Sequence, residues 1–124
     1  MKTSSRNRLA NATNPYQGNS KKVLAVCSAG LLRSPTIAWM LSNDPFNFNT
    51  RSCGAVEEYA LIPLDDALIL WADEVVVVES WMKDMILDHD PNKVVHLIST
   101  PDNYGTRDPA LCSYLAPKLK DIFL

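Results

Sequence analysis

The stretch that decides the fold and the chemistry of this chain is VCSAGLLRSP, residues 26–35. It completes a short apolar run, Val23–Val26, which is typical of a strand buried on both faces. Pro35 favours the start of a helix, because proline is tolerated in the first helical turn. The segment therefore predicts a cysteine at the carboxyl end of a buried strand, a loop of small residues, and an arginine where the next helix begins.

Each part of this segment suits the binding of a phosphoryl group. A tight loop before a helix turns its backbone N–H groups inward, and with the helix dipole they form a cradle for an anion. Gly30 can adopt the positive φ that such a curl needs. The cradle favours the thiolate form of Cys27, and the planar fork of Arg33 matches two phosphoryl oxygens. Ser34 either donates its hydroxyl to the thiolate or caps the helix. The other residues expected to surround the phosphate are Ser28, Ala29, Leu31 and Leu32.

The remainder of the chain alternates between strand and helix patterns. Further strands are expected at Phe48–Ser52, Glu74–Val78 and Lys93–Ile98, and helices within 34–42, 64–72, 80–87 and 108–123, with Ser80 and Asp108 as N-caps of the last two. This order predicts an α/β fold, a four-stranded parallel sheet in a doubly wound three-layer sandwich. Ligands of such sheets bind at the carboxyl ends of the strands, near the switch point.

Composition and charge narrow the class of protein. The chain has 124 residues, of which 47% are hydrophobic, and this is enough for one core but too little for two. A formal net charge of −2 argues against a nucleic-acid partner. No apolar run approaches the length of a membrane span, so no membrane partner is expected. No pattern indicates an oligomeric state.

The first twenty residues differ from the rest of the chain. Residues 1–20 are polar, which predicts a flexible amino-terminal arm before one domain at 21–124. The alternative is an ordered arm lying on the domain, anchored by Leu9 and Tyr16. Because the arm lacks the apolar middle of a secretory signal, a cytoplasmic location is expected.

Three cysteines stand far apart in the sequence, at Cys27, Cys53 and Cys112. Their odd number and wide spacing fit neither a disulfide framework nor a zinc ribbon. Cys53 and Cys112 are expected to be small buried hydrophobic residues. The cluster Asp88–Asp90 looks like a metal site, but its neighbours predict a helix end and a turn. No metal or other cofactor is therefore expected.

Several motifs resemble one known family. Residues 26–35 are similar to the phosphate-binding loop of the low-molecular-weight protein tyrosine phosphatases, Arg51–Gly54 to the family's Ser-Ala-Gly segment, and Trp71–Glu79 to the segment through its third strand. The resemblance is closest to a compact branch of small predicted phosphatases with Ile-Pro-Asp-x-Tyr and Asp-Pro-x-Leu motifs. These motifs correspond here to Thr100–Tyr104 and Asp108–Leu111. The match begins near residue 22 and implies a flavodoxin-like, phosphotyrosine phosphatase I-like fold.

The resemblance also implies a mechanism without a metal. Cys27 would attack phosphorus and form a phosphocysteine intermediate. Arg33 and the loop amides would hold the three equatorial oxygens. An aspartate after the fourth strand would protonate the leaving group and then activate water. The expected substrate is a phosphotyrosine protein or a small aryl phosphate.

Two aspartates compete for the role of general acid. Asp102 lies in Pro101–Gly105, which resembles the family's Asp-Pro-Tyr-Tyr-Gly motif with proline and aspartate exchanged. Asp108 keeps the Asp-Pro dipeptide, but its simplest role is to cap a helix. We expect Asp102 to be the acid, with Asp108 as the alternative.

The expected pocket departs from the family at its loop and its rim. The family usually has Asn at the position of Gly30, and many members have a second cysteine at the position of Leu32. Tyr104 and Tyr59 are candidates for the aromatic walls that favour phosphotyrosine, although core or surface positions suit both equally well.

Two other functions are compatible with the sequence. Arsenate reductases share a similar fold and anion loop, but they need further cysteines to pass on a disulfide. A phosphate- or phosphopeptide-binding module with no turnover would need the loop without an effective acid.

Overall fold

A four-stranded parallel sheet forms the centre of the protein in the computed structural model, which describes residues 20–124. The strands lie in the order β2-β1-β3-β4. Their bounds are Lys22–Cys27 (β1), Asn49–Gly54 (β2), Glu74–Val77 (β3) and Val94–Leu97 (β4). Because the chain adds β2 on one side of β1 and β3 on the other, the switch point lies at the carboxyl end of β1.

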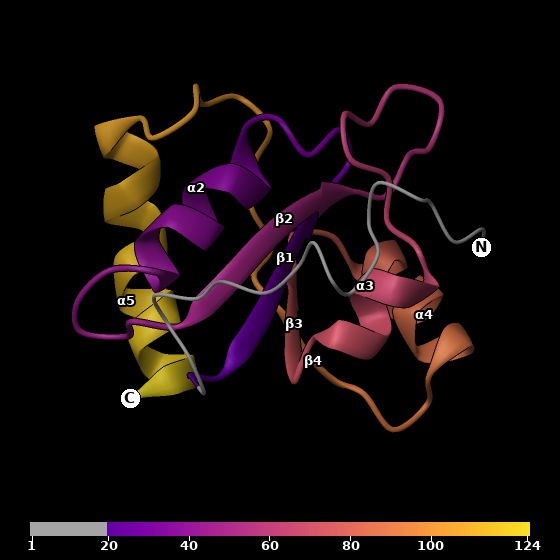
Figure 1. Ribbon diagram of the computed structural model, residues 1–124. Coiled ribbons are helices and arrows are strands. Elements are labelled where there is room, and N and C mark those ends of the chain that lie inside the picture. The colour runs from indigo at the N-terminus through magenta and orange to yellow at the C-terminus, as the bar shows by residue number, and fades with distance from the viewer. Residues whose placement is uncertain (1–19) are drawn as a thin grey trace.

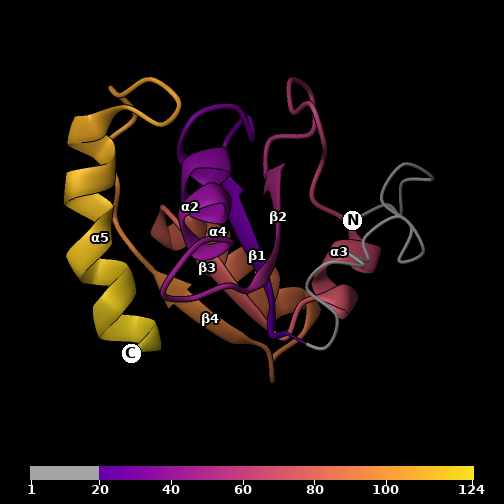
Figure 2. The same ribbon diagram turned by 60° about the vertical axis from the view of Figure 1, so that its left-hand side comes forward.

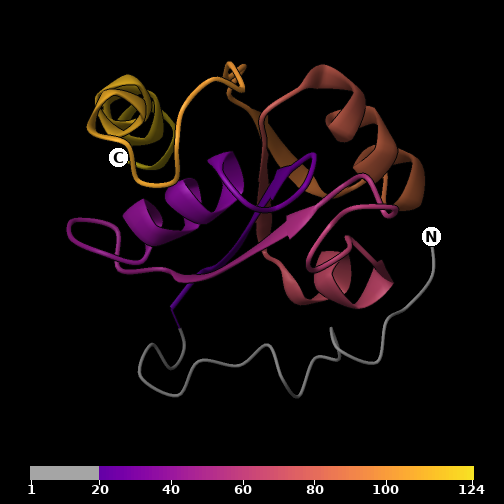
Figure 3. The same ribbon diagram turned by 90° about the horizontal axis from the view of Figure 1, so that it is seen from above.

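Helices cover both faces of this sheet (Figures 1, 2 and 3). The helices α2 and α5 lie on one face, and α3 and α4 lie on the other. Their bounds are Arg33–Leu41 (α2), Asp66–Trp71 (α3), Ser80–His89 (α4) and Pro109–Phe123 (α5). The predicted doubly wound α/β sandwich is thereby confirmed.

The elements agree with the sequence patterns to within a few residues at each end. The second strand runs on to Gly54, because its pairing with β1 continues as far as Cys27. Phe48 lies outside that strand, and its ring packs edge-on against Phe123. The prediction that Ser80 caps α4 was wrong: the residue at the N-cap is Glu79, whose side chain is engaged elsewhere.

The core explains why the central strands β1 and β3 have few polar residues. Val23–Val26 and Val75–Val78 are fully buried, since helices cover both faces of the sheet. Burial of each such side chain contributes roughly 1.5–3 kcal/mol before the entropy of ordering is counted. These two buried runs form the base that positions the residues directly after them, Cys27 and Glu79.

Two further expectations from the sequence concern the amino-terminal arm and the absence of a membrane span. The amino-terminal arm, at residues 1–20, lies outside the described residues except for its last member. Among residues 20–124, no helix is long and apolar enough to cross a membrane.

Candidate active site

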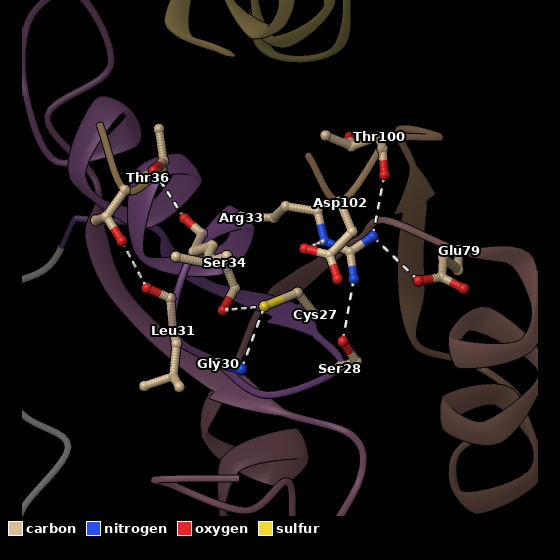
Figure 4. Close-up of polar contacts among 12 residues, drawn as sticks. Cys27, Ser28, Gly30, Leu31, Arg33, Ser34, Thr36, Glu79, Thr100 and Asp102 are labelled. Atoms are coloured by element: carbon tan, nitrogen blue, oxygen red, sulfur yellow. Dashed lines mark hydrogen bonds and ion pairs between the residues drawn. The ribbon is translucent and has the colours of Figure 1, made fainter. Parts of the chain in front are cut away.

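The candidate site lies at the carboxyl edge of the sheet, where three strand ends meet. The first strand ends at Cys27, the third leads to Glu79, and the fourth leads to the segment Thr100–Asp102. Figure 4 shows the side chains from these segments gathered around Arg33, the first residue of α2. Parallel strands bring their carboxyl ends to one edge, so residues far apart in the sequence share one site.

The loop after β1 curls tightly around the sulfur of Cys27. This side chain is 2% exposed, and its Sγ accepts a hydrogen bond from the backbone N–H of Gly30 at 3.2 Å. Gly30 has the predicted positive φ, at +74°, and a Cβ there would lie 2.9 Å from the backbone carbon of Cys53. The loop can therefore pack this closely on β2 only with glycine at this position.

Ser34 faces the cysteine and does not cap the helix. Its hydroxyl accepts from the Cys27 thiol at 3.1 Å and donates to the carbonyl of Cys53 at 3.2 Å. The N-cap position of α2 is Leu32. Because a hydroxyl can rotate, the same group can donate to Cys27 once the thiol has lost its proton.

Arg33 is the largest fully buried side chain, with 2% of its surface exposed. Its Nη1 donates to Glu79 Oε2 and to the carbonyl oxygen of Thr100, each at 3.0 Å, and its Nη2 donates to Ser28 Oγ at 3.1 Å. A guanidinium has five N–H donors, so these bonds occupy three and leave two. The two that remain are the Nε–H and one N–H of Nη2, which lie along one edge of the group.

That remaining edge has no hydrogen-bond partner at Nε among the described residues. Asp102 approaches Nε with its Oδ1 at 3.5 Å, close enough for charge attraction but beyond a good hydrogen bond. An Nε–Nη2 edge of this kind can hold two oxygens of one anion in parallel. The buried guanidinium is thus arranged to receive a phosphoryl group beside Cys27.

A pocket of about 170 Å³ opens above the loop. Its lining consists of the cysteine, four residues of the loop and one carboxylate: Cys27, Ser28, Ala29, Leu31, Leu32 and Asp102. Of the two candidate acids, Asp102 is therefore the one that lies in the pocket. Asp108 accepts the N–H of Ala110 at 2.8 Å and caps α5, as its sequence pattern predicts.

The two tyrosines expected as walls lie elsewhere. Tyr104 is partly buried and packs against the core, and Tyr59 is 58% exposed in the segment between β2 and α3. Neither belongs to the residues that line the pocket. The walls are formed instead by two aliphatic side chains, Leu31 and Leu32, which are 47% and 37% exposed.

The loop that holds Asp102 is fastened to the loop after β1 and to α2 by contacts that the sequence did not predict. Thr106 Oγ1 donates to the carbonyl of Leu31 at 2.7 Å, and the N–H of Arg107 donates to Thr36 Oγ1 at 2.8 Å. The guanidinium of Arg107 also lies over the ring of Trp39, 4.6 Å from its centroid. These contacts connect the segment that holds Asp102 to the loop after β1 and to α2.

Glu79 was also missed as a site residue. Sequence analysis placed it in the segment that resembles the family's third strand and gave it no role. A signal was nevertheless present, since a carboxylate follows directly after a buried valine run. Such a residue lies at the ligand-binding edge of a parallel sheet.

The other two cysteines lie outside the pocket. Cys53 is buried in β2, where desolvation, together with the negative charges of Cys27 and Asp65, raises the pKa of its thiol well above the usual value. Cys112 lines a separate cavity of about 370 Å³ between α2 and α5. Within residues 20–124, no group of three or more His, Cys, Asp or Glu side chains could hold a metal ion.

Comparisons with known proteins identify the fold. No family model matches the chain, and no curated protein matches it. Among solved structures, it is similar to the YwlE arginine phosphatase from Geobacillus stearothermophilus, with a TM-score of 0.58 and 23% sequence identity. The similarity covers 82% of this chain and 94% of that one. The chain therefore shares its fold with that arginine phosphatase, which agrees with the low-molecular-weight protein tyrosine phosphatase-like fold that the sequence motifs imply.

Proposed function

We propose that this chain is a cysteine-dependent phosphatase that hydrolyses phosphotyrosine or other aryl phosphate monoesters. The observation that carries the proposal is the buried guanidinium of Arg33, whose Nε has no hydrogen-bond partner among the described residues and lies 3.5 Å from Oδ1 of the pocket residue Asp102. A buried cation with N–H donors left over favours an anion that can accept from two of them at once. A phosphoryl group meets that need and places phosphorus next to the sulfur.

The first chemical step transfers the phosphoryl group to sulfur. The Cys27 thiolate attacks phosphorus, the S–P bond forms, and the bond from phosphorus to the leaving oxygen breaks. Protonated Asp102 gives its proton to that oxygen, so the product leaves as a neutral phenol. Arg33 and the loop amides hold the equatorial oxygens as their charge redistributes. Ser34 donates its hydroxyl to sulfur while the thiolate is free.

The second step reverses the role of the acid. Asp102, now a carboxylate, takes a proton from a water molecule whose oxygen attacks phosphorus. The S–P bond breaks, inorganic phosphate is released, and the thiolate is restored. Both steps need one group that alternates between acid and base, and Asp102 lies in the pocket with 55% of its side chain exposed to water.

The pocket walls favour an aryl ester among phosphate monoesters. Leu31 and Leu32 present apolar surface to whatever is attached to the phosphoryl group, and a flat ring buries well against such side chains. The similar solved structure is an arginine phosphatase, so phosphoarginine is the second candidate substrate. Asp102 is the one carboxylate among the pocket's lining residues, and it would have to serve both as acid and as partner for the arginine side chain.

The deciding test is hydrolysis of p-nitrophenyl phosphate, phosphotyrosine and phosphoarginine by freshly reduced protein in the presence of chelator. Wild type should release phosphate from the two aryl esters. The Cys27→Ser variant should lose at least about four orders of magnitude in kcat, since the nucleophile is removed. Turnover of phosphoarginine alone would replace the aryl proposal with the second candidate. Binding of phosphate without turnover would indicate a phosphate-binding module and contradict the phosphatase proposal.

Arsenate reduction is less well supported, because it needs a second thiol within reach of Cys27. Neither Cys53 nor Cys112 lines the pocket, and the raised pKa of the Cys53 thiol opposes its reaction as a thiolate. Replacing both by serine should leave phosphatase activity in place. A loss of arsenate-dependent thiol oxidation in these variants would instead support the reductase.

A further inference from the structure

The carboxylate of Glu79 joins two side chains, and both of them are hydrogen-bond donors. Its Oε2 accepts from Arg33 Nη1 at 3.0 Å, and its Oε1 accepts from the indole N–H of Trp81 at 2.8 Å. Trp81 is 42% exposed in the first turn of α4, and Glu79 precedes that helix. The three side chains form a continuous chain of contacts from the molecular surface to the buried guanidinium.

This arrangement needs a carboxylate at position 79. An indole N–H and a guanidinium can only donate, so the residue between them must accept at both of its ends. An amide of the same shape has one accepting oxygen and could satisfy only one neighbour. The hydrogen bond from Trp81, and to a lesser extent that from Arg33, hold the pKa of Glu79 below its ordinary value against desolvation. The group therefore accepts from both donors at neutral pH.

The contact determines how the arginine is turned. Glu79 and the carbonyl of Thr100 together use both N–H groups of Nη1. This leaves Nε on the side of two pocket residues: its distance to Oδ1 of Asp102 is 3.5 Å, and the neighbouring Nη2 donates to Ser28. Without Glu79, Asp102 would be the nearer carboxylate for Arg33. The guanidinium would then be drawn to the very group that has to act as acid.

We propose that Glu79, held by Trp81, is a positioning residue that fixes which edge of Arg33 meets the phosphoryl group. The inference rests on the proposed phosphatase function, because it assigns a role around the same arginine. It adds a second carboxylate to the site with a task different from that of Asp102: Glu79 orients the phosphate clamp, and Asp102 moves protons.

The test measures inorganic phosphate binding and aryl phosphate hydrolysis separately. Phosphate is titrated into the protein while the backbone amide signals of residues 28–33 are followed by NMR, which needs no turnover. The variants are Glu79→Gln, Trp81→Phe and the double variant. The matched control is Asp84→Asn, which removes one exposed carboxylate from the same helix. Thermal unfolding of each variant establishes that the chain is folded.

Glu79→Gln should weaken phosphate binding about tenfold and lower kcat/KM by at least that factor, because a charged hydrogen bond to the clamp is lost. Trp81→Phe should weaken binding about threefold, since it removes one neutral donor. The control Asp84→Asn should stay within about twofold of wild type. In the Trp81→Phe background, the amide oxygen at position 79 is free to face Arg33, so Glu79→Gln should cost less there than in wild type.

Three outcomes would overturn the proposal. If Glu79→Gln binds phosphate as Asp84→Asn does, Glu79 does not position the clamp, while the phosphatase function stands. If the two substitutions at 79 and 81 are strictly additive, the Trp81 contact does not hold Glu79. If wild type neither binds phosphate nor hydrolyses aryl phosphates, the proposed function fails, and this inference fails with it.

Discussion

The loop after β1 and the loop after β4 face the same pocket but are held in different ways. The first packs its Gly30 so closely on β2 that a Cβ there would lie 2.9 Å from backbone atoms. The second is mostly exposed, and a Cβ at its Gly105 would meet nothing within 4 Å. One loop is shaped by the core, and the other is fastened by a few side-chain contacts to α2 and to the first loop.

This difference matches the two tasks that the proposed function assigns to the site. A phosphate cradle has to hold several N–H groups at fixed positions before the substrate arrives, which favours a rigid loop. An acid that later activates water has to reach two different oxygens, so its loop benefits from fewer constraints. The following substitutions test this contrast, beginning with the largest expected effect.

Arg33→Lys changes the residue at the end of the rigid loop and should abolish most of the phosphatase activity. Lysine keeps the charge but cannot bond Glu79 and Thr100 while presenting two N–H groups to phosphate. We expect kcat/KM for p-nitrophenyl phosphate to fall about 10³-fold, in line with the loss of a preorganised donor fork. A variant that keeps a tenth or more of the wild-type value would show that a point charge is sufficient.

Asp102→Asn should lower kcat about 10²-fold for aryl phosphates with a basic leaving group, because general acid catalysis is lost. The loss should shrink when the leaving phenolate is a weak base and needs no proton. Asp108→Asn is the control, since asparagine also caps helices and should preserve activity. Comparable losses in both variants would contradict the assignment of Asp102.

Gly30→Ala and Gly105→Ala form a matched pair across the two loops. Alanine at position 30 combines strain at φ +74° with backbone overlap, and we expect it to destabilise the fold by about 1–3 kcal/mol and to lower kcat about tenfold. Alanine at position 105 has open space and should change stability by less than about 1 kcal/mol. Denaturant unfolding measures both, and equal effects would remove the contrast between the loops.

Thr106→Val should have the smallest effect. The substitution keeps the shape of the side chain but removes its hydrogen bond to the Leu31 carbonyl. Because only one exposed, neutral hydrogen bond is removed, we expect kcat to fall about threefold, with KM for the substrate nearly unchanged. Thr106→Ser should restore the wild-type rate, because serine keeps the donor. Failure of serine to do so would mean that the hydrogen bond does not steady the acid's loop.

Sequence patterns were sufficient for the elements and for the position of the first loop between β1 and α2. Continuous valine runs indicated buried strands, and the spacing from Cys27 to Arg33 placed nucleophile and clamp around one short loop. Both signals are local, so they can be recognised without knowledge of the packing. The prediction for the N-cap of α4 was wrong. Ser80 has a suitable side chain, but the chain enters the helix one residue earlier, so Glu79 occupies the N-cap position.

The pocket walls and the partners of Arg33 could not be predicted in the same way. Tyr104 stands next to the acid's loop in the sequence, yet it packs on the core, because the direction of a loop side chain depends on its contacts. Glu79 and Thr100 lie 46 and 67 positions from Arg33. Nothing in the local sequence couples residues at such separations.

By itself, the sequence determined a doubly wound α/β domain and a loop suited to bind a phosphoryl group at the end of its first strand, because hydrophobic periodicity and loop chemistry act over a few residues. Tertiary structure alone decided that Glu79, Thr100 and Asp102 surround one buried guanidinium, whose Nε is left without a hydrogen bond among the described residues. The reason is geometric: parallel strands bring their carboxyl ends to one edge, and only the packed sheet determines which side chains meet there.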